Sequence, residues 1–262
     1  MRRNLFCALG KSDNNMEVQK EEKKPISIIL LTWNRIELLK KTLTGIKERT
    51  KHPYKLIVVD NFSDDGTQDF LRQETKKGFI QILILNDINL GQTAAFNKAF
   101  AYVDSETFIV TQDDLIPPDL EPCWLEQMDY LLRKNKGLGG LCMRIQRVPN
   151  IHFDNENEIT PCRKACPAYL RIQYKEDLLK LPNLFGNRMY HEDSHFQDLI
   201  QSIDKKCGFT THIFADHCSY MKPNKGYGDR INYAGYNAER NKVPSYKPYP
   251  KIDPKTNIPQ LK

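Results

Sequence analysis

Residues 26–46, "ISIILLTWNRIELLKKTLTGI", decide the fold because a strand and a helix follow each other within one short stretch. The first eight residues, "ISIILLTW", form an unbroken β-rich apolar run, which is typical of a strand buried on both faces. Asn34, with Glu37 three residues later, is a capping signal for a helix. Apolar residues then recur at helical spacing, at Ile36, Leu39, Leu43 and Ile46.

The same strand-then-helix unit repeats along the next part of the chain. We expect further strands at residues 55–60, 80–85 and 107–111, and helices at about 67–77, closed by Gly78, and 92–103. Strands that alternate with helices predict an α/β fold with a mainly parallel, mixed central sheet and helices on both faces. The N-terminal half is therefore expected to be Rossmann-like and to bind a nucleotide at the carboxyl ends of its strands.

The second half of the chain is less regular. The patterns predict a helix at about 120–135, a strand in the "LGGLCMRI" run, a loop over one edge at 146–167, and a half-buried strand in "AYLRIQY". A helix is expected to begin near Glu192 and to end at Gly208, before a strand in "FTTHIF". We expect one domain, residues 25–222, with an N-terminal half (25–115) and a C-terminal half (116–222), between a flexible extension (1–24) and an extended Pro/Tyr/Lys-rich arm (223–262).

Composition limits the class of protein. The chain has 262 residues, of which 40% are apolar, enough for a substantial core. No apolar run approaches the ~18 residues of a membrane span, and the start is too interrupted for a secretory signal, so we expect a cytoplasmic protein without a transmembrane segment. Seven scattered cysteines then favour reduced thiols, and Cys162 and Cys166 have no second pair at zinc-finger spacing. The net charge of +6 suggests an anionic partner.

The stretch "VVDNFSDDGT", residues 58–67, ends a predicted strand in a group of acids. An EF-hand is excluded because the closing acid would fall on Arg72. Asp60 at the strand end can accept a hydrogen bond from the edge of a nucleobase, whereas Asp64 and Asp65 are equally well explained as turn residues.

A second pair, Asp113 and Asp114, follows the strand "FIVTQ" at the same predicted edge. Adjacent carboxylates repel each other, so a bound cation is a reasonable interpretation, and a divalent ion could neutralise a diphosphate leaving group. An acidic turn before two prolines is the alternative.

Two further candidates come later in the chain. Asp193, next to Glu192, stands at the mouth of a predicted helix, where acids also serve simply to cap the helix. His217 follows a strand and is a candidate ligand for the same metal, although a lone histidine there is more often structural.

Four stretches, in this order, resemble the family-2-type glycosyltransferases of GT-A fold, over about residues 26–220. They are "ISIILLTWNR" with "LIVVDNFSDDGT", then "NLGQTAAFNKAF", "FIVTQDDLIPPDL" and "GNRMYHEDSHFQDLIQSIDKKCGF". Each motif alone is weak, and the ordered set is fairly specific. The resemblance implies transfer of a sugar from a nucleotide-sugar donor, most often a UDP-sugar, to an acceptor hydroxyl with inversion.

The resemblance also implies roles for single residues. Asp193 matches the general base, and Asp114 and His217 match the ligands of a Mn²⁺ or Mg²⁺ ion on the diphosphate. Donor-binding positions fall on Thr32, Asn34, Asp60, Gln92, Asn97, Gln112 and Asp113. The chain departs from the family pattern at Gln112, where the first acid of the D-x-D triplet is usual, and at Phe96, where arginine is common. These departures weaken the expectation for metal affinity and donor identity.

The residues support the same chemistry on physical grounds. Glycosyl transfer passes through an oxocarbenium-like state, so it needs positive charge on the leaving diphosphate and a base on the opposite side of the sugar. A nucleotidyltransferase and a dinucleotide-dependent oxidoreductase are disfavoured because no glycine-rich loop follows the first strand.

The acceptor stays open in the sequence. It can be a glycan, a lipid-linked sugar, a protein or a nucleic acid. Tyrosines interleave with basic residues after Lys222, which suits phosphates and stacked bases, so a hydroxylated base of DNA is one of the alternatives. A catalytically silent protein that binds glycans or nucleic acid is the rival from another class.

Overall fold

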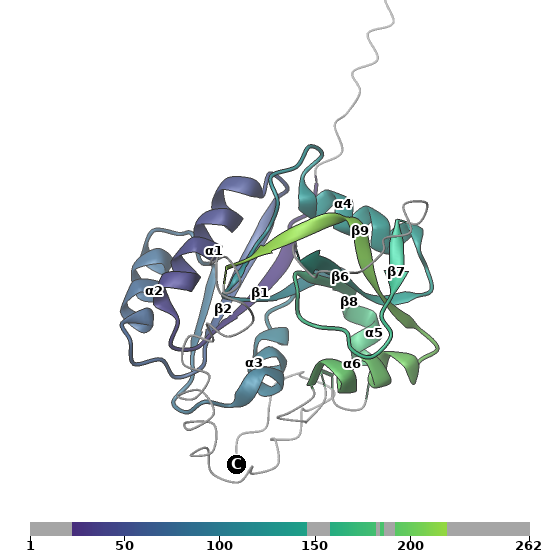
Figure 1. Ribbon diagram of the computed structural model, residues 1–262. Helices are drawn as coiled ribbons and strands as arrows, with labels where there is room; N and C mark the ends of the chain where they lie inside the picture. Colours follow the sequence, from purple (N-terminus) through teal and green to yellow (C-terminus); the bar gives the residue numbers. More distant parts are fainter. Residues whose placement is uncertain (1–22, 146–157, 182–183, 186–191, 219–262) are drawn as a thin grey trace, which may run out of the picture.

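The structure is a computed structural model that describes residues 23–145, 158–181, 184–185 and 192–218 (Figure 1). The expected arm at 223–262 and nearly all of the expected extension at 1–24 lie outside the described residues. The strands are β1 (Ile26–Thr32), β2 (Tyr54–Asp60), β3 (Ile82–Leu85), β4 (Thr107–Gln112), β5 (Leu115–Ile116), β6 (Leu138–Ile145), β7 (Ile159–Pro161), β8 (Arg171–Tyr174) and β9 (Lys206–His217). The helices are α1 (Ile36–Arg49), α2 (Thr67–Lys76), α3 (Gly91–Phe100), α4 (Trp124–Lys134), α5 (Lys175–Leu179) and α6 (Glu192–Gln201).

Within the described residues, the nine strands belong to one mixed sheet. Its order is β3-β2-β1-β4-β8-β6-β9-β5, and β7 pairs with β9 outside this path. The first four of these strands, β3, β2, β1 and β4, run parallel to one another, and β8 runs antiparallel to both β4 and β6. The N-terminal half is thus a Rossmann-like parallel sheet, and the predicted fold class is confirmed.

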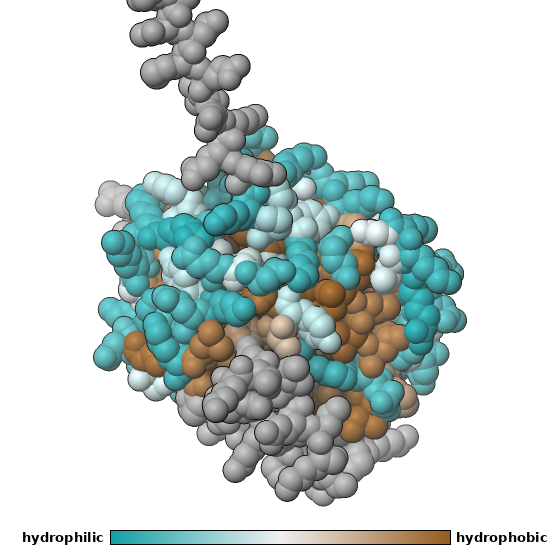
Figure 2. Space-filling model, turned by 180° about the vertical axis from the view of Figure 1, so that it is seen from behind, coloured by the Kyte–Doolittle hydropathy of each residue, from teal (hydrophilic) through white to brown (hydrophobic). Residues whose placement is uncertain are grey.

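A separate apolar core lies on each face of the sheet. Residues of β1 alternate between the cores: Ile28 and Leu30 pack with α1, α2 and α4, whereas Ile29 and Leu31 pack with α3, α5 and α6. Burial of both strand faces explains why β1 and β2 read as unbroken apolar runs instead of alternating ones. Helices cover both faces, as predicted, and Figure 2 shows that polar side chains dominate the outer surface seen from behind, with apolar patches beside the grey residues.

The start of α1 differs from the prediction. The helix is capped at Arg35, without a side-chain capping bond, and Asn34 adopts φ 50°. The Asn34 side chain instead accepts a hydrogen bond from the Asp64 N–H at 2.8 Å, and the Ile36 N–H donates to the Asp65 carboxylate at 3.0 Å. The cap of α1 therefore comes from the loop after β2, thirty residues away, which no local pattern can reveal.

Several predictions for the second half are also corrected. The part of the expected 146–167 loop that is described contains β7, which pairs with β9. The strand β8 is buried along Arg171, Ile172 and Gln173 instead of half-buried, because it lies between β4 and β6 in the sheet interior. The last helix, α6, ends at Gln201, and Gly208 lies within β9. Among the described residues, no helix combines the length and the apolar character needed to cross a membrane.

Candidate active site

The carboxyl ends of the parallel strands bring the predicted donor residues to one edge of the sheet. Thr32, the last residue of β1, is the register partner of Asp60, the last residue of β2. On its other side β1 pairs with β4, where Leu31 is opposite Gln112. Asp113 and Asp114 follow directly after β4. Ligands of open parallel sheets bind at such an edge, so these residues are placed where a nucleotide is expected.

Asp60 has one satisfied carboxylate oxygen and one that is not. The side chain is fully buried. Its Oδ2 accepts hydrogen bonds from the Ser63 N–H and from the Gln68 side chain, both at 3.0 Å. Its Oδ1 is buried and has no hydrogen-bond partner among the described residues. An unmet buried acceptor costs about 1–3 kcal/mol, so this atom is suited to accept an N–H from a bound ligand.

Asp113 is turned into the protein. Its Oδ2 accepts a hydrogen bond from the Thr32 hydroxyl at 2.7 Å, and its Oδ1 forms an ion pair with Arg35. Burial raises the pKa of Asp113 to about 6, although the Arg35 charge acts in the opposite direction. Within the described residues, both oxygens of Asp113 are therefore used to connect the ends of β1 and β4.

Arg35 contributes a positive charge to this site that no pattern in the sequence indicated. The guanidinium forms ion pairs with both neighbouring acids, at 2.9 Å to Asp114. Burial alone would lower the pKa of Arg35, but Asp113 and Asp114 raise it above its ordinary value, so the guanidinium stays charged. The only signal in the sequence was a basic residue directly after a strand end, which is too common to be informative.

The two predicted metal ligands lie next to each other. The strand β5 pairs with β9 so that Leu115 is opposite His217, and the His217 Nε2 is 3.8 Å from the Asp114 Oδ2. Burial lowers the pKa of His217, more than the Asp114 charge raises it, which favours the neutral imidazole that metals require. Two ligands at about 2.0–2.2 Å from one ion can be separated by this distance, so the donor set fits a divalent cation.

The loops after β1 and β2 are bound to each other. The Asn34 N–H donates to the Ser63 hydroxyl at 2.8 Å, in addition to the Asn34 contact with Asp64. Asn34, predicted to bind donor, therefore holds the two loops together in this structure.

The remaining donor candidates lie on and near α3. The Gln112 side chain donates to the Gln92 side chain, which connects the end of β4 with the start of α3. Asn97 accepts a hydrogen bond from the Phe185 N–H at 3.1 Å. Phe96, where the family often has arginine, is buried and packs 5.5 Å from the Phe185 ring.

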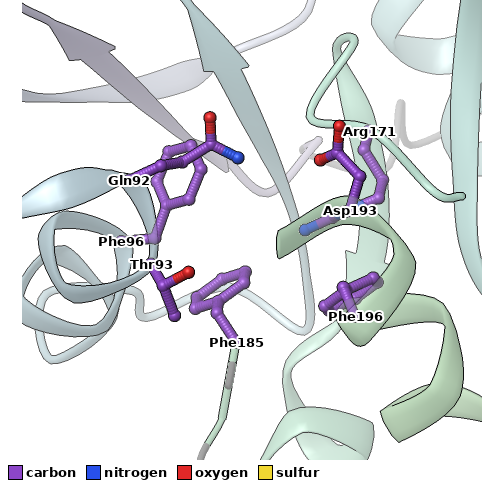
Figure 3. A pocket seen from close by; sticks show the side chains of 7 residues that line it. All are labelled: Gln92, Thr93, Phe96, Arg171, Phe185, Asp193 and Phe196. Carbon is purple, nitrogen blue, oxygen red and sulfur yellow. The ribbon is translucent and has the colours of Figure 1, made fainter. Parts of the chain in front are cut away.

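Asp193, the predicted base, shares a pocket with Gln92. The pocket is lined by Gln92, Thr93, Phe96, Arg171, Phe185, Asp193 and Phe196. Figure 3 shows the residues of α3 facing Asp193 and Phe196 of α6, with Arg171 of β8 close to Asp193. Because Gln92 also bonds Gln112, a continuous set of contacts leads from the end of β4 to the pocket that holds Asp193.

This arrangement, a parallel sheet with acids at its carboxyl edge and a further acid on a helix across a pocket, defines a nucleotide-binding α/β protein of GT-A fold. The profile of glycosyl transferase family 2 matches residues 27–196. The chain belongs to this family.

Related proteins agree with this assignment. An undecaprenyl-phosphate 4-deoxy-4-formamido-L-arabinose transferase of Serratia proteamaculans is 31% identical over 103 residues, 37% of this chain and 31% of the relative. This chain matches a third or less of the length of its curated relatives.

Solved structures share the fold. The mannosyltransferase PcManGT of Pyrobaculum calidifontis, in complex with GDP-Man and Mn²⁺, superposes with a TM-score of 0.61 at 18% identity, over 88% of this chain and 67% of that one. S. aureus TarS 1–349 in complex with UDP superposes with a TM-score of 0.55 at 14% identity, over 74% of this chain and 60% of that one.

Proposed function

We propose that this protein is an inverting glycosyltransferase that moves a sugar from a UDP-sugar to an acceptor hydroxyl. The observation that carries the proposal is the inner oxygen of Asp60, a buried acceptor at the end of β2 without a partner among the described residues. A uracil base carries an N–H on its flat edge that would satisfy this oxygen. TarS, which shares the fold, was solved with UDP and with UDP-GlcNAc.

The donor would lie along the sheet edge. Asp60 would accept from the base, and Thr32, which bonds Asp113 at 2.7 Å, would fix the end of β1 beside it. Gln92, Gln112 and Asn97 would contact the ribose and sugar from the α3 side. Asn34 and Asp113, whose polar atoms hold the loops and Arg35, would act by positioning these contacts.

Asp114 and His217 would hold a divalent ion, Mn²⁺ or Mg²⁺. When bound, the ion would supply Lewis-acid stabilisation of the leaving diphosphate. Arg35, whose guanidinium lies 2.9 Å from the Asp114 Oδ2, balances part of the charge of Asp113 and Asp114 beside the proposed ion.

Asp193 would take the proton from the acceptor hydroxyl. A general base contributes about 10²–10⁴-fold to a rate, and a carboxylate is suited to an alcohol whose proton becomes acidic late in bond formation. The base must face the anomeric carbon from the side opposite the diphosphate, as in other inverting transfers. The position that supports this role for Asp193 is its place in the pocket on the α6 side, whereas Asp60 and Asp114 stand at the sheet edge.

For the acceptor we propose a glycan hydroxyl, with nucleic acid as the alternative raised by the basic, tyrosine-rich arm. A gel-shift experiment with DNA over a range of salt concentrations separates the two. Phosphate contacts predict a shift that disappears steeply as salt rises, and a glycan acceptor predicts no shift.

The test of the function pairs two variants. The wild-type chain, incubated with a panel of sugar nucleotides and Mn²⁺, is expected to hydrolyse one donor slowly and to bind the matching nucleoside diphosphate in calorimetry. Asp60→Ala is expected to weaken that binding at least tenfold, because the N–H of the base loses its acceptor. Asp193→Asn is expected to bind the nucleotide like wild type and to lose transfer by about 10²-fold or more.

Asp64→Ala is the matched control, since this neighbouring acid is exposed and should leave both readouts unchanged. Transfer at the wild-type rate by Asp193→Asn would remove Asp193 from its role. Absence of turnover and of binding for every donor would favour the silent binding protein instead.

A further inference from the structure

Four cysteines that are scattered in the sequence come together beside the sheet. Cys142 lies on β6, Cys162 and Cys166 lie between β7 and β8, and Cys207 lies on β9. The sulfur atoms of Cys142, Cys162 and Cys166 all lie within 4.8 Å of one another. The two innermost, those of Cys142 and Cys166, are 3.3 Å apart.

Cys207 completes the group from the neighbouring strand. It is the register partner of Gly140 on β6, two residues from Cys142 and therefore on the same face of the sheet. A Cβ atom at Gly140 would lie 3.3 Å from the Cys166 sulfur and 3.5 Å from the Cys207 sulfur, so both sulfurs lie over the bare Cα of this glycine.

We propose that Cys142, Cys162, Cys166 and Cys207 form a structural zinc site. Zinc in such sites is bound tetrahedrally by four thiolates at about 2.3 Å, which places the sulfurs roughly 3.8 Å apart. The spacing of the Cys142, Cys162 and Cys166 sulfurs needs only small side-chain movements to reach this geometry, and the Cys207 sulfur, which lies outside that group of three, would turn toward them from β9. A disulfide is the poorer fit, because its sulfurs are about 2.05 Å apart and it would use only two of the four groups.

The surroundings suit an anionic metal centre. Zinc with four thiolates carries a charge of about −2, which needs positive charge or N–H donors close by. Arg171, 2% exposed, donates from Nη1 to the Cys166 carbonyl, and Arg144, 6% exposed, lies on β6 two residues from Cys142. Two buried guanidinium groups beside a thiol cluster are costly unless negative charge accompanies them.

The zinc site would fix the position of Asp193, the residue proposed as the general base. The Cys166 N–H donates to the carbonyl of Asp193, near the start of α6, at 3.0 Å. The Arg171 guanidinium, on β8, lies 3.5 Å from the centre of the Phe196 ring, which also belongs to α6. A metal that fixes Cys166 would thereby fix the start of α6. This consequence rests on the proposed function of Asp193, whereas the zinc site itself does not.

Metal content tests the site without any activity assay. The untagged full chain is purified without chelator from cells grown with zinc. Elemental mass spectrometry is expected to find one zinc ion per chain. Cys142→Ser, Cys166→Ser and the less buried Cys162→Ser are each expected to lose most of it. Cys123→Ser is the matched control, because Cys123 is equally buried but lies on the other face of the sheet, and it should retain the zinc.

Two further measurements test zinc binding without cysteine variants, which could lose zinc simply because they misfold. Replacement of zinc by Co²⁺ in the wild-type chain is expected to give the intense charge-transfer absorption of a cobalt–thiolate centre. Gly140→Ala, which keeps all four cysteines but crowds two sulfurs, is expected to weaken zinc binding at least tenfold in a chelator competition. A folded wild-type chain that carries no zinc, or a Cys142–Cys166 disulfide found by peptide mapping, would overturn the proposal.

The effect on catalysis is measured separately. Removal of the zinc is expected to lower the transfer rate and to leave nucleotide binding unchanged, because the donor residues lie on other elements. If the chain carries zinc but transfers no sugar, the proposed function fails and the zinc site stands.

Discussion

At the scale of single residues, Asp65 joins the starts of two helices. Its carboxylate accepts the Ile36 N–H of α1 at 3.0 Å and the Thr67 N–H of α2 at 3.1 Å. Burial acts to raise the pKa of Asp65, but the polar groups of Thr67 and the Ile36 N–H around the carboxylate outweigh it and hold the pKa below the ordinary 3.8. A folded-state pKa below the unfolded one means that the bonds contribute stability above about pH 4, which is lost as the pH falls through the folded-state pKa.

Asp65→Ala is therefore expected to lower the free energy of unfolding by about 1 kcal/mol at pH 7, the usual effect of losing a helix cap. The deficit should shrink in denaturant titrations below pH 4, where the wild-type carboxylate is protonated as well. Asp64→Ala is the control, because in the described structure the Asp64 side chain caps no helix. A deficit that is the same at pH 3 and pH 7 would contradict the capping role of the charge.

Arg35 is the second residue whose removal should lower the free energy of unfolding. Without it, Asp113 and Asp114 would be adjacent buried acids that lack their cation, and breaking such a pair costs about 3–5 kcal/mol when both partners are fully buried. Because the Arg35 side chain is 39% exposed, we expect Arg35→Ala to cost about 2–3 kcal/mol in the free energy of unfolding.

Mn²⁺ is expected to restore part of this loss, since it would bring positive charge to Asp114. Arg49→Ala is the control. Arg49 forms an ion pair with Asp216 at 3.7 Å, but both side chains are partly exposed. The loss of this pair should therefore cost less than about 1 kcal/mol in the free energy of unfolding. Equal losses in the two variants, measured by denaturant titration, would show that Arg35 has no special part in the acid pair.

At the scale of elements, α1 and β5 meet at a glycine. A Cβ atom at Gly45 would lie nearer to the Ile116 side chain than Cβ atoms in real proteins approach their neighbours, so the two groups would collide. The strand β5 also carries Leu115 opposite His217, so this contact lies close to the Asp114–His217 pair. Gly45→Ala is expected to destabilise the fold by about 1–2 kcal/mol, because overpacking outweighs the ~1 kcal/mol that alanine gains in a helix.

Thermal unfolding of a double variant tests this explanation. Ile116→Ala should rescue Gly45→Ala, since it removes the group that the new methyl would meet. Thr44→Ala, on the exposed side of the same helix, should change the free energy of unfolding by no more than about 0.5 kcal/mol. Failure of the double variant to recover stability would mean that the cost comes from elsewhere in α1.

The elements that could be predicted are those with strong local signals. The apolar runs of β1 and β2 and the stripes of α1 and α4 follow from burial that repeats with a fixed period, so they were predicted within a few residues. The strand β8 was misjudged because Arg171 and Gln173 are polar and yet buried, a combination that depends on partners far away in the chain.

The site could be predicted only in part for the same reason. The acids at the strand ends were visible because parallel strands end at one edge whatever their loops contain. Arg35 and the cysteine group could not be predicted, because each depends on contacts between residues far apart in the sequence, which the sheet brings together. Arg35 is 78 and 79 residues from its acids. Cys142 is 24 residues from Cys166. The roles of Asp60, Asp114 and Asp193 stay predictions.

At the scale of the whole molecule, the two halves of the sheet meet at the site. The parallel half supplies Asp60 and Asp114, and the mixed half supplies His217 through β9 and Arg171 through β8. The Gln112–Gln92 bond and the pocket around Asp193 connect the halves on the α3 side. A ligand at the sheet edge would therefore contact groups from both halves and hold them in one arrangement.

This leads to a prediction for the stability of the whole chain. A ligand that binds only the folded state, present at 100 times its dissociation constant, stabilises that state by about 2.7 kcal/mol, which raises Tm by roughly 5–10 °C for a domain of this size. We expect UDP with Mn²⁺ to give such a shift in calorimetry. Asp60→Ala and Asp114→Ala should lose most of it, because each removes a ligand contact, and Asp193→Asn should keep it, because the acceptor side does not touch the nucleotide. An unchanged shift in Asp60→Ala would mean that the nucleotide binds away from the ends of β1 and β2, and the donor site would have to be sought on another part of the molecule.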